Sequence, residues 1–173
     1  MGIPERPHKV KLIIGMLSND IEAMKKAEAM LVRVFGVTDL ESGLLDFTHS
    51  DYYTKEMGPG LKRKFLSYRK LLELKNIYKV KLTTNMLERK LMKAGRRSVN
   101  IDPGYLDLAK LVLFSTKDYI HRIYLNGGIF AETTLFYKDK KFNAWPWTYP
   151  DYASDAYINI FNSIRGLYGE GLR

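Results

Sequence analysis

The first apolar segment of the chain has the pattern of a buried strand followed by a helix. Residues 8–17, HKVKLIIGML, alternate charged and apolar side chains and then become wholly apolar, which predicts a central β-strand. Asn19 with Glu22 three places on forms a capping pattern that opens a helix ending at Gly36. The apolar positions of that helix recur every three or four residues on one face: Ile21, Met24, Ala27, Leu31, Val34 and Phe35.

Three further runs predict strands by their alternation. In ESGLLDFTHSDYY, residues 41–53, Leu45, Phe47 and His49 share one side. In LKRKFLSY, residues 61–68, Leu61, Arg63 and Phe65 share one face, opposite Lys62, Lys64 and Leu66. YKVKLTT, residues 78–84, predicts another strand, after which Asn85 and Glu88 repeat the capping pattern of a short helix ending near Gly95.

The stretch SVNIDPGYLDLAKLVL, residues 98–113, has two interpretations. Asp102 is a good N-cap and proline is favoured just after it, so a short strand followed by a helix accounts for both residues. That cap leaves Asn100 and Tyr105 unexplained. An active-site loop, or a helix start whose amide groups bind an anion, is the other interpretation.

The second half of the chain predicts a three-stranded antiparallel meander and a closing helix. DYIHRIYL, GIFAETTLFY and KKFNAWPW are aromatic and β-branched runs separated by Asn-Gly and Lys-Asp-Lys. A two-residue turn at Asn126 and Gly127 sets His121 opposite Glu132, whereas a three-residue turn sets Arg122 there, so Glu132 gains a basic neighbour either way. The last helix has one apolar face, formed by Tyr157, Phe161, Ile164 and Tyr168.

These elements predict an α+β fold: a mixed, mostly antiparallel sheet with three or four helices, in the manner of an elaborated ferredoxin-like domain. The 173 residues contain no long linker or low-complexity tract, so we expect a single domain over residues 1–173.

Composition narrows the functional classes. The chain has no cysteine, which excludes disulfides, thiolate metal sites and cysteine nucleophiles. The absence of glutamine beside abundant lysine and glutamate is typical of thermophilic proteins. No apolar run approaches the roughly 18 residues of a membrane span, and the N-terminal run reads as a strand rather than a signal peptide. We therefore expect a cytoplasmic protein without a membrane partner.

The net charge of +9 favours anionic partners such as nucleotides, RNA or phosphorylated metabolites. Basic positions cluster near aromatic ones, and basic groups hold phosphates while aromatic faces stack on bases. The residues expected to bind such a ligand are Lys62, Arg63, Arg96, Arg97, Asn100, Asp102, Tyr105 and Trp147.

Several phrases also carry a family resemblance: DYYTKEMGPGLKRKFLS, KLTTNMLE, GRRSVNIDPGYLDLAKLVLFSTKDYIHRIYL and PWTYPDY. Their order resembles a family of small uncharacterised bacterial and archaeal proteins that share a domain of unknown function. Some members carry an automated GTP-binding label, and the resemblance implies no catalytic residue. The chain has no P-loop, and STKDY places its acid, Asp118, one position too early for the guanine-reading motif, so a conventional GTPase is excluded.

The histidines give weak catalytic signals. Neither His49 nor His121 begins a His-x-Ser/Thr triplet, and no His-Glu-x-x-His spacing occurs, so no metal site is predicted. The pairing of His121 with Glu132 suits a general acid or base, or a plain cross-strand ion pair. An acid–base or metal site in a small hydrolase or transferase, the alternative function, would use His121, Glu132, His49, Asp51 and Glu56, with Asp102 nearby.

The two hypotheses can be separated by geometry. If residues 51–60, 100–105 and 146–152 converge in space, a ligand site becomes the leading interpretation, and if they are scattered, each is a local turn. The sequence specifies neither a cofactor nor an oligomeric state.

Overall fold

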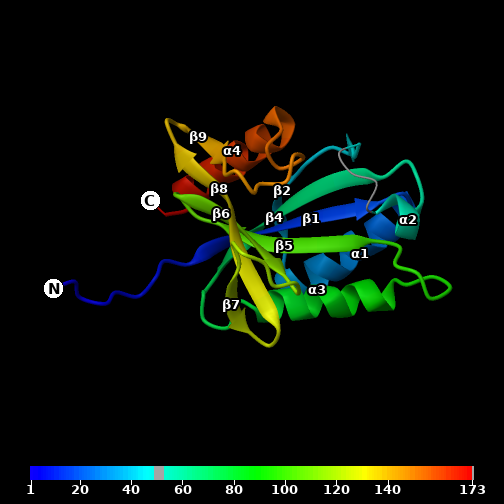
Figure 1. The fold of residues 1–173 in the computed structure, drawn as a ribbon, viewed down its shortest axis with the longest axis horizontal. Coiled ribbons are helices and arrows are strands. Elements are labelled where there is room, and N and C mark those ends of the chain that lie inside the picture. Colours follow the sequence, from blue (N-terminus) through cyan, green and yellow to red (C-terminus); the bar gives the residue numbers. More distant parts are fainter. Residues whose placement is uncertain (49–52, 173) are drawn as a thin grey trace.

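The computed structural model describes residues 1–48 and 53–172, which form one antiparallel sheet with three long helices against it (Figure 1). The strands described are β1 (Val10–Ser18), β2 (Thr38–Glu41), β3 (Leu45–Asp46), β4 (Lys62–Leu72), β5 (Asn100–Leu106), β6 (Lys110–Ser115), β7 (Ile123–Asn126), β8 (Ile129–Lys138) and β9 (Lys141–Ala144). The helices described are α1 (Ile21–Phe35), the single turn α2 (Thr54–Met57), α3 (Lys79–Lys90) and α4 (Asp155–Glu170). This confirms the α+β class.

The strand order is β2-β4-β1-β5-β6-β8-β7, with β3 beside β4 and β9 beside β8, and each of these pairings is antiparallel. Without the short β3 and α2, the first part of the chain runs β1-α1-β2-β4-α3-β5, a β-α-β-β-α-β succession. The ferredoxin-like elaboration stays a prediction, because β6 to β9 extend the sheet beyond that unit.

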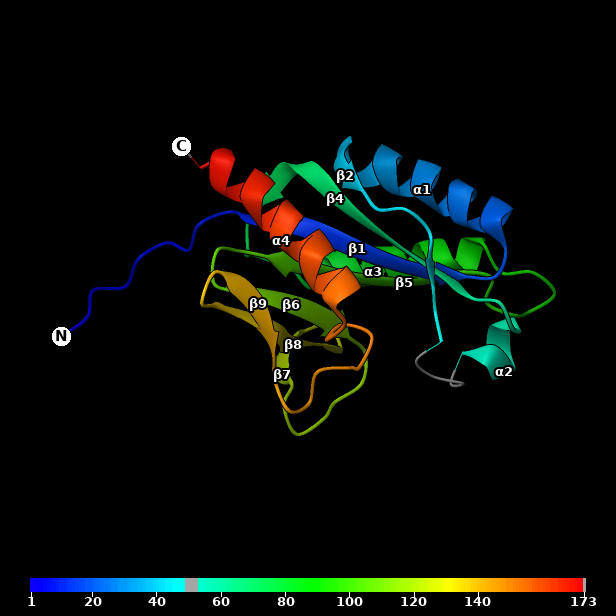
Figure 2. The ribbon, with the colours of Figure 1, turned by 90° about the horizontal axis from the view of Figure 1, so that it is seen from above.

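Helices cover both faces of the sheet. Successive side chains of a strand point to opposite sides, so one strand can contribute to the core on each face. Leu12 and Ile14 of β1 belong to a core with α1 and α3, whereas Ile13 between them belongs to a second core with α4. Figure 2 shows α4 crossing one face of β1. All nine residues of β1 are buried, as expected for a central strand.

Two helix predictions are confirmed with small corrections. The four α4 residues predicted to face the core are all buried: Tyr157, Phe161, Ile164 and Tyr168. In α1, Met24, Ala27 and Leu31 are buried, but Val34 is half exposed. The cap of α1 is Asp20 rather than Asn19, since the Asp20 carboxylate accepts a hydrogen bond from the Ala23 amide at 2.9 Å.

The strand predicted over residues 78–84 is wrong, because this segment forms the first half of α3. Val80, Thr84 and Leu87 are buried at a helical spacing of three or four, while Leu82 is 41% exposed. A short run with alternating apolar residues is compatible with a strand and with a helix, and here packing against β5 favours the helix.

The helix predicted from Asp102 is also wrong, since residues 100–106 form β5 and residues 110–115 form β6. The side chain that organises the turn is Asp107, whose carboxylate accepts hydrogen bonds from the amides of Ala109 at 2.8 Å and Lys110 at 2.9 Å. Pro103 is tolerated in β5 because it lacks an N–H only on the edge that faces away from β1. On that edge β6 begins to pair at Gly104, so no strand there requires a donor from Pro103.

The predicted meander differs in turn and arrangement. Gly127 and Gly128, both with positive φ, form the turn, since Asn126 pairs with Ile129. The register that pairs Ile123 with Ala131 brings Arg122 opposite Glu132, the second of the two alternatives. β8 pairs with β6 along one edge, so β7 and β9 lie one after the other along its opposite edge.

The strand expected to carry Leu45, Phe47 and His49 on one side is reduced to β3, which ends at Asp46, and residues 49–52 lie outside the described residues. In the part of the chain that the structure describes, no helix is both long and apolar enough to cross a membrane.

Candidate ligand-binding site

The sheet opens between β5 and β6. These strands pair over only three residues each, Gly104 to Leu106 with Leu111 to Leu113. The start of β5 continues beside β1, and the end of β6 continues beside β8. The two strands therefore diverge from the Gly104–Leu113 pair toward the start of β5 and the end of β6, and a hollow lies between them.

Side chains of α3 complete the open edge of β5. Glu88 accepts a hydrogen bond from the Ile101 amide at 2.6 Å, and Lys81 donates one to the Ile101 carbonyl at 2.9 Å. Buried backbone groups need partners, and the diverging β6 supplies none at this position. Lys81 is 7% exposed and forms no ion pair with the described residues.

The hollow is a pocket of about 450 Å³, a volume typical of small-molecule sites. Tyr149 to Tyr152, in the loop that follows β9, line it, and so does Tyr53, the residue before α2. Its lining residues are Phe47, Tyr53, Arg63, Lys81, Arg97, Asn100, Asp102, Leu113, Phe114, Ser115, Thr116, Lys117, Arg122, Glu132, Tyr149, Pro150, Asp151 and Tyr152.

Arg63 of β4 is the deepest cation of the pocket. Its Nη1 donates to Asp102 at 3.1 Å and its Nη2 to Asp151 at 3.4 Å, while its buried Nε has no hydrogen-bond partner among the described residues. Gly15 of β1 leaves room for it, because a Cβ there would lie 3.3 Å from Arg63 Nη1 and 3.2 Å from the Tyr152 hydroxyl.

A second group of polar contacts continues from Asp102 toward the rim. Asn100 donates through its amide to Asp102 at 2.6 Å and accepts through its oxygen from Arg97 at 2.6 Å. Arg97 also donates to Glu56 at 3.1 Å and lies 3.6 Å from Glu88. Carboxylates thus hold both Arg63 and Arg97 in place, and the buried Asn100 amide links Arg97 to Asp102.

Burial and charge act against each other on the acidic groups here. Burial alone would raise the pKa of Asp102, but the charges of Arg63 and Lys81 outweigh it and lower that pKa below its ordinary value. For Glu88 burial prevails and raises the pKa, although Lys81 and the Ile101 amide oppose it. Asp102 therefore ionises more readily than an ordinary aspartate, in spite of its burial.

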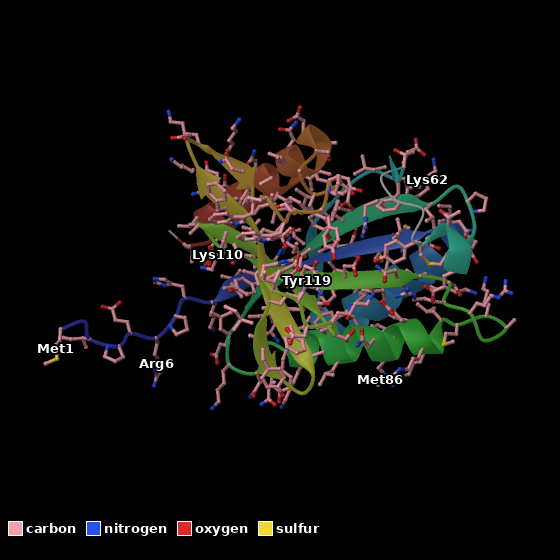
Figure 3. All side chains as sticks on the ribbon, in the orientation of Figure 1. Met1, Arg6, Lys62, Met86, Lys110 and Tyr119 are labelled. Carbon is pink, nitrogen blue, oxygen red and sulfur yellow. The ribbon has the colours of Figure 1, made fainter. Side chains whose placement is uncertain are left out.

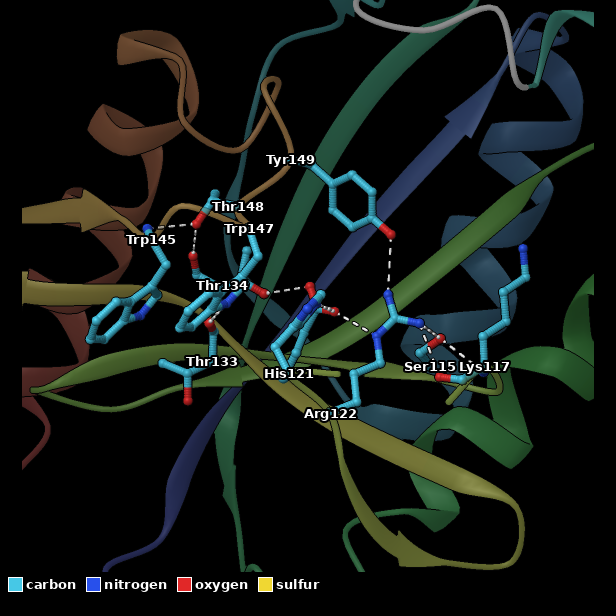
Figure 4. Close-up of polar contacts among 11 residues, drawn as sticks. Ser115, Lys117, His121, Arg122, Thr133, Thr134, Trp145, Trp147, Thr148 and Tyr149 are labelled. Atoms are coloured by element: carbon cyan, nitrogen blue, oxygen red, sulfur yellow. Dashed lines mark hydrogen bonds and ion pairs between the residues drawn. The ribbon is translucent and has the colours of Figure 1, made fainter. Parts of the chain in front are cut away.

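On the β8 side, Glu132 is buried and contacts two basic residues, His121 and Arg122, which Figure 4 labels. His121 Nε2 lies 3.1 Å from Glu132 Oε2, and Arg122 Nε donates to the same oxygen at 2.7 Å. Arg122 also donates to the hydroxyls of Ser115 at 3.0 Å and Tyr149 at 3.1 Å. Each of the three guanidinium nitrogens of Arg122 therefore donates to the pocket wall, so Arg122 links β6, β8 and the loop after β9.

An aromatic stack stands next to this wall. His121 stacks on Trp147 with centroids 5.6 Å apart, and Trp147 stacks on Trp145 at 5.1 Å with 7° between the planes. Trp147 donates to the Thr133 carbonyl at 3.2 Å, and the Thr148 hydroxyl donates to the Thr134 carbonyl at 2.6 Å. These contacts occupy the stretch of β8 between β7 and β9 and appear in Figure 4.

The three segments whose convergence distinguishes a ligand site from local turns do meet at the pocket, through Tyr53, through Asn100 and Asp102, and through residues 149–152. Of the other residues predicted to bind a ligand, Arg63 and Arg97 line the pocket. Those outside the lining take other contacts: Lys62 pairs with Asp46, Arg96 lines a smaller polar hollow, Tyr105 packs near Phe114, and Trp147 belongs to the stack.

The residues predicted for acid–base chemistry do not all come together at the pocket. Glu132 lines the pocket, but His121 stands behind it with 12% of its side chain exposed. Glu56 contacts Arg97 at the rim, and His49 and Asp51 lie outside the described residues. Across residues 1–48 and 53–172, no group of three or more histidine and acidic side chains could hold a metal ion.

Comparison with known proteins gives a family and no function. A family model for a domain of unknown function, DUF4416, matches residues 8–168. The chain belongs to the DUF4416 family. No curated protein and no solved structure matches it. The function of this DUF4416 protein must therefore be argued from its pocket.

Sequence reasoning missed Lys81 as a pocket residue because it placed residues 78–84 in a strand. The buried helical spacing of Ile77, Val80, Thr84 and Leu87 was the signal that could have corrected this. Asp151 was missed because nothing local distinguishes it from an ordinary turn aspartate.

Proposed function

We propose that this DUF4416 protein binds a small anionic ligand that carries a planar ring, such as a nucleotide or another phosphorylated metabolite, in the pocket between β5 and β6. The observation that carries the proposal is Lys81. Its ammonium group is buried at the pocket, and among residues 1–48 and 53–172 it donates to a single acceptor, the Ile101 carbonyl.

An ammonium group has three donors, and buried donors without acceptors are costly. The carboxylates of the lining accept from other cations: Asp102 and Asp151 from Arg63, and Glu132 from Arg122. A phosphate or carboxylate of a ligand would supply the acceptors that Lys81 lacks, and a charge-assisted bond to it would be strong.

The aromatic residues support a ring-bearing ligand. Phe47, Tyr53, Tyr149 and Tyr152 all line the pocket, and aromatic faces stack on planar rings. A volume of about 450 Å³ suits one mononucleotide rather than a nucleic-acid strand. Recognition would proceed without a P-loop, through side chains of β4, β5 and α3.

The alternative, a hydrolase or transferase, has one supporting observation, the contact of His121 with Glu132. Arg122 shares the same carboxylate oxygen, and His121 does not line the pocket, so a structural ion pair accounts for the contact. Binding is the better-supported function.

Calorimetric titration at low salt tests the proposal with inorganic phosphate, AMP, GMP, GTP and the uncharged nucleoside adenosine. GTP is included because some similar proteins carry a GTP-binding label. We expect the nucleotides to bind and adenosine to bind far more weakly. Lys81→Met should weaken nucleotide binding by about ten-fold or more, the value of a charge-assisted hydrogen bond.

The matched control is Lys79→Met, which removes an exposed lysine two residues away on the same helix. If Lys81→Met fails to fold, Tyr149→Ala provides a second test, because it should weaken AMP but not inorganic phosphate. Absence of binding by every anion of the panel would refute the proposal, as would equal losses in the Lys81 and Lys79 variants.

A further inference from the structure

We propose that β7 pairs with the β7 of a second copy of this chain, forming a twofold dimer in which the two sheets join edge to edge. This inference is independent of the proposed ligand. It concerns the end of the sheet, whereas the pocket lies between β5 and β6.

β7 is the last strand of the sheet order, and within the described residues it pairs only with β8. Its outer backbone groups are thus available to another strand. Natural proteins usually protect such edges with charged side chains. Residues 119–128 contain one arginine, Arg122, and its charge is already compensated by Glu132. Residues 119–128 contain no lysine and no acidic residue that would repel an approaching strand.

The side chains around the edge form an exposed apolar patch. Ile120 is 94% exposed, Ile123 74%, Tyr119 65% and Tyr124 57%. We call these four residues, with Leu82 and Met86 of α3, the apolar patch. Ile123 lies on the same face of β7 as Leu125, which packs against the core of α1 and α3, and Tyr124 lies on the opposite face, so the patch wraps around the strand edge. Figure 3 labels two of these residues, Tyr119 and Met86.

The patch is continuous from strand to helix. A Cβ built on Gly127, at the turn after β7, would lie 3.2 Å from the ring of Tyr78 and 3.5 Å from Leu82. The β7–β8 hairpin therefore rests against α3, and the exposed face of α3 extends the apolar surface beyond the strand edge.

Its size is in the range that a dimer needs. If each of the six side chains offered roughly 100 Å², the patch would offer roughly 600 Å², the low end of the ~600–1,000 Å² per partner that specific interfaces bury. Patches of this kind on soluble proteins mark interaction sites.

A second copy fits this edge better than other occupants. An antiparallel strand can pair with itself around a twofold axis, so the same surface serves both subunits. We place Ile123 opposite the Ile123 of the second copy, which sets Arg122 beside Tyr124 across the axis. Nucleic acid is disfavoured at the strand edge, because its binding depends on uncompensated cations and the one arginine of residues 119–128 is paired with Glu132.

Light scattering coupled to size exclusion tests the dimer over a range from low to high micromolar protein. We expect the wild-type mass to double with concentration, and Ile123→Asp and Ile123→Lys each to weaken dimerisation by about ten-fold or more, because like charges then meet across the axis. An equimolar mixture of the two variants should recover the dimer, because aspartate then faces lysine.

Leu44→Asp is the matched control, since Leu44 is 50% exposed and precedes β3, toward the opposite end of the sheet. Hydrogen exchange provides a second measurement: amides of residues 123–126 should become protected as wild-type concentration rises. A wild-type monomer at high concentration overturns the proposal, and so does a dimer that both Ile123 variants leave intact.

Discussion

Arg63 shows how a single residue can organise a pocket. It carries a buried positive charge between two carboxylates, and the rings of Phe47, Phe65 and Tyr152 lie within 6 Å of its guanidinium. Buried ion pairs of this kind add little net stability, but removing one partner leaves the other uncompensated.

Arg63→Met should therefore lower the free energy of unfolding by about 3–5 kcal/mol at neutral pH, because Asp102 and Asp151 would remain buried without their cation. Urea denaturation measures it. Lys62→Met is the adjacent control, and since Lys62 and Asp46 form an exposed pair, it should cost no more than about 1 kcal/mol.

The same difference should depend on pH. The pKa of Asp102 is lowered in the folded protein from its ordinary value of 3.8, so the stability it contributes is present above that value. It is lost as pH falls through the lower folded pKa, where the carboxylate is protonated. The gap between wild type and Arg63→Met should shrink on acidification below about pH 4, and a constant gap would contradict the ion-pair account.

At the residue level, the sequence indicated part of the pocket for sound reasons. Alternation placed Arg63 on the same face as Phe65, and both are buried together. Clustering of polar residues singled out Asn100 and Asp102. Asp151 could not be found, because its partner Arg63 is 88 positions away and no local rule joins them.

Among the elements, β5 explains most of what sequence reasoning missed. Asp102 and Pro103 match the start of a helix, but pairing with β1 along seven positions outweighs that local preference. Residues 100–106 therefore form β5, a strand in the middle of the sheet, and Asp102 caps no helix.

Gly104 in β5 gives a test of that packing. A methyl carbon there would overlap the carbonyl oxygen of Val112 in β6, so Gly104→Ala should lower the free energy of unfolding by about 3 kcal/mol or more. Gly166→Ala, in α4 with open space around it, should instead raise it by about 0.5–1 kcal/mol. Thermal denaturation compares the two, and equal effects would contradict the close approach of β5 and β6.

For the whole molecule, one sheet serves two cores. Leu31 of α1 belongs to one core and Phe161 of α4 to the other, and β1 contributes to both. The α+β class followed from helical and alternating periods. The strand order did not, because it depends on contacts between segments far apart in sequence.

A shared sheet predicts that the chain unfolds as a single domain. Leu31→Ala and Phe161→Ala remove buried side chains on opposite faces of the sheet. Each should lower the free energy of unfolding by about 2–5 kcal/mol and leave a single thermal transition with a lower midpoint temperature. Calorimetry checks this, because a two-state transition has equal calorimetric and van't Hoff enthalpies. Two separate transitions in either variant would divide the chain into domains.

The stack of Trp145, Trp147 and His121 has an optical consequence. These are the two tryptophans of the sequence, so the whole indole emission of the protein originates at one place. Trp147 precedes Tyr149 by two residues, and Tyr149 lines the pocket. Changes in emission, and in the near-ultraviolet circular dichroism of the stacked rings, would thus report events at the pocket wall without an added dye.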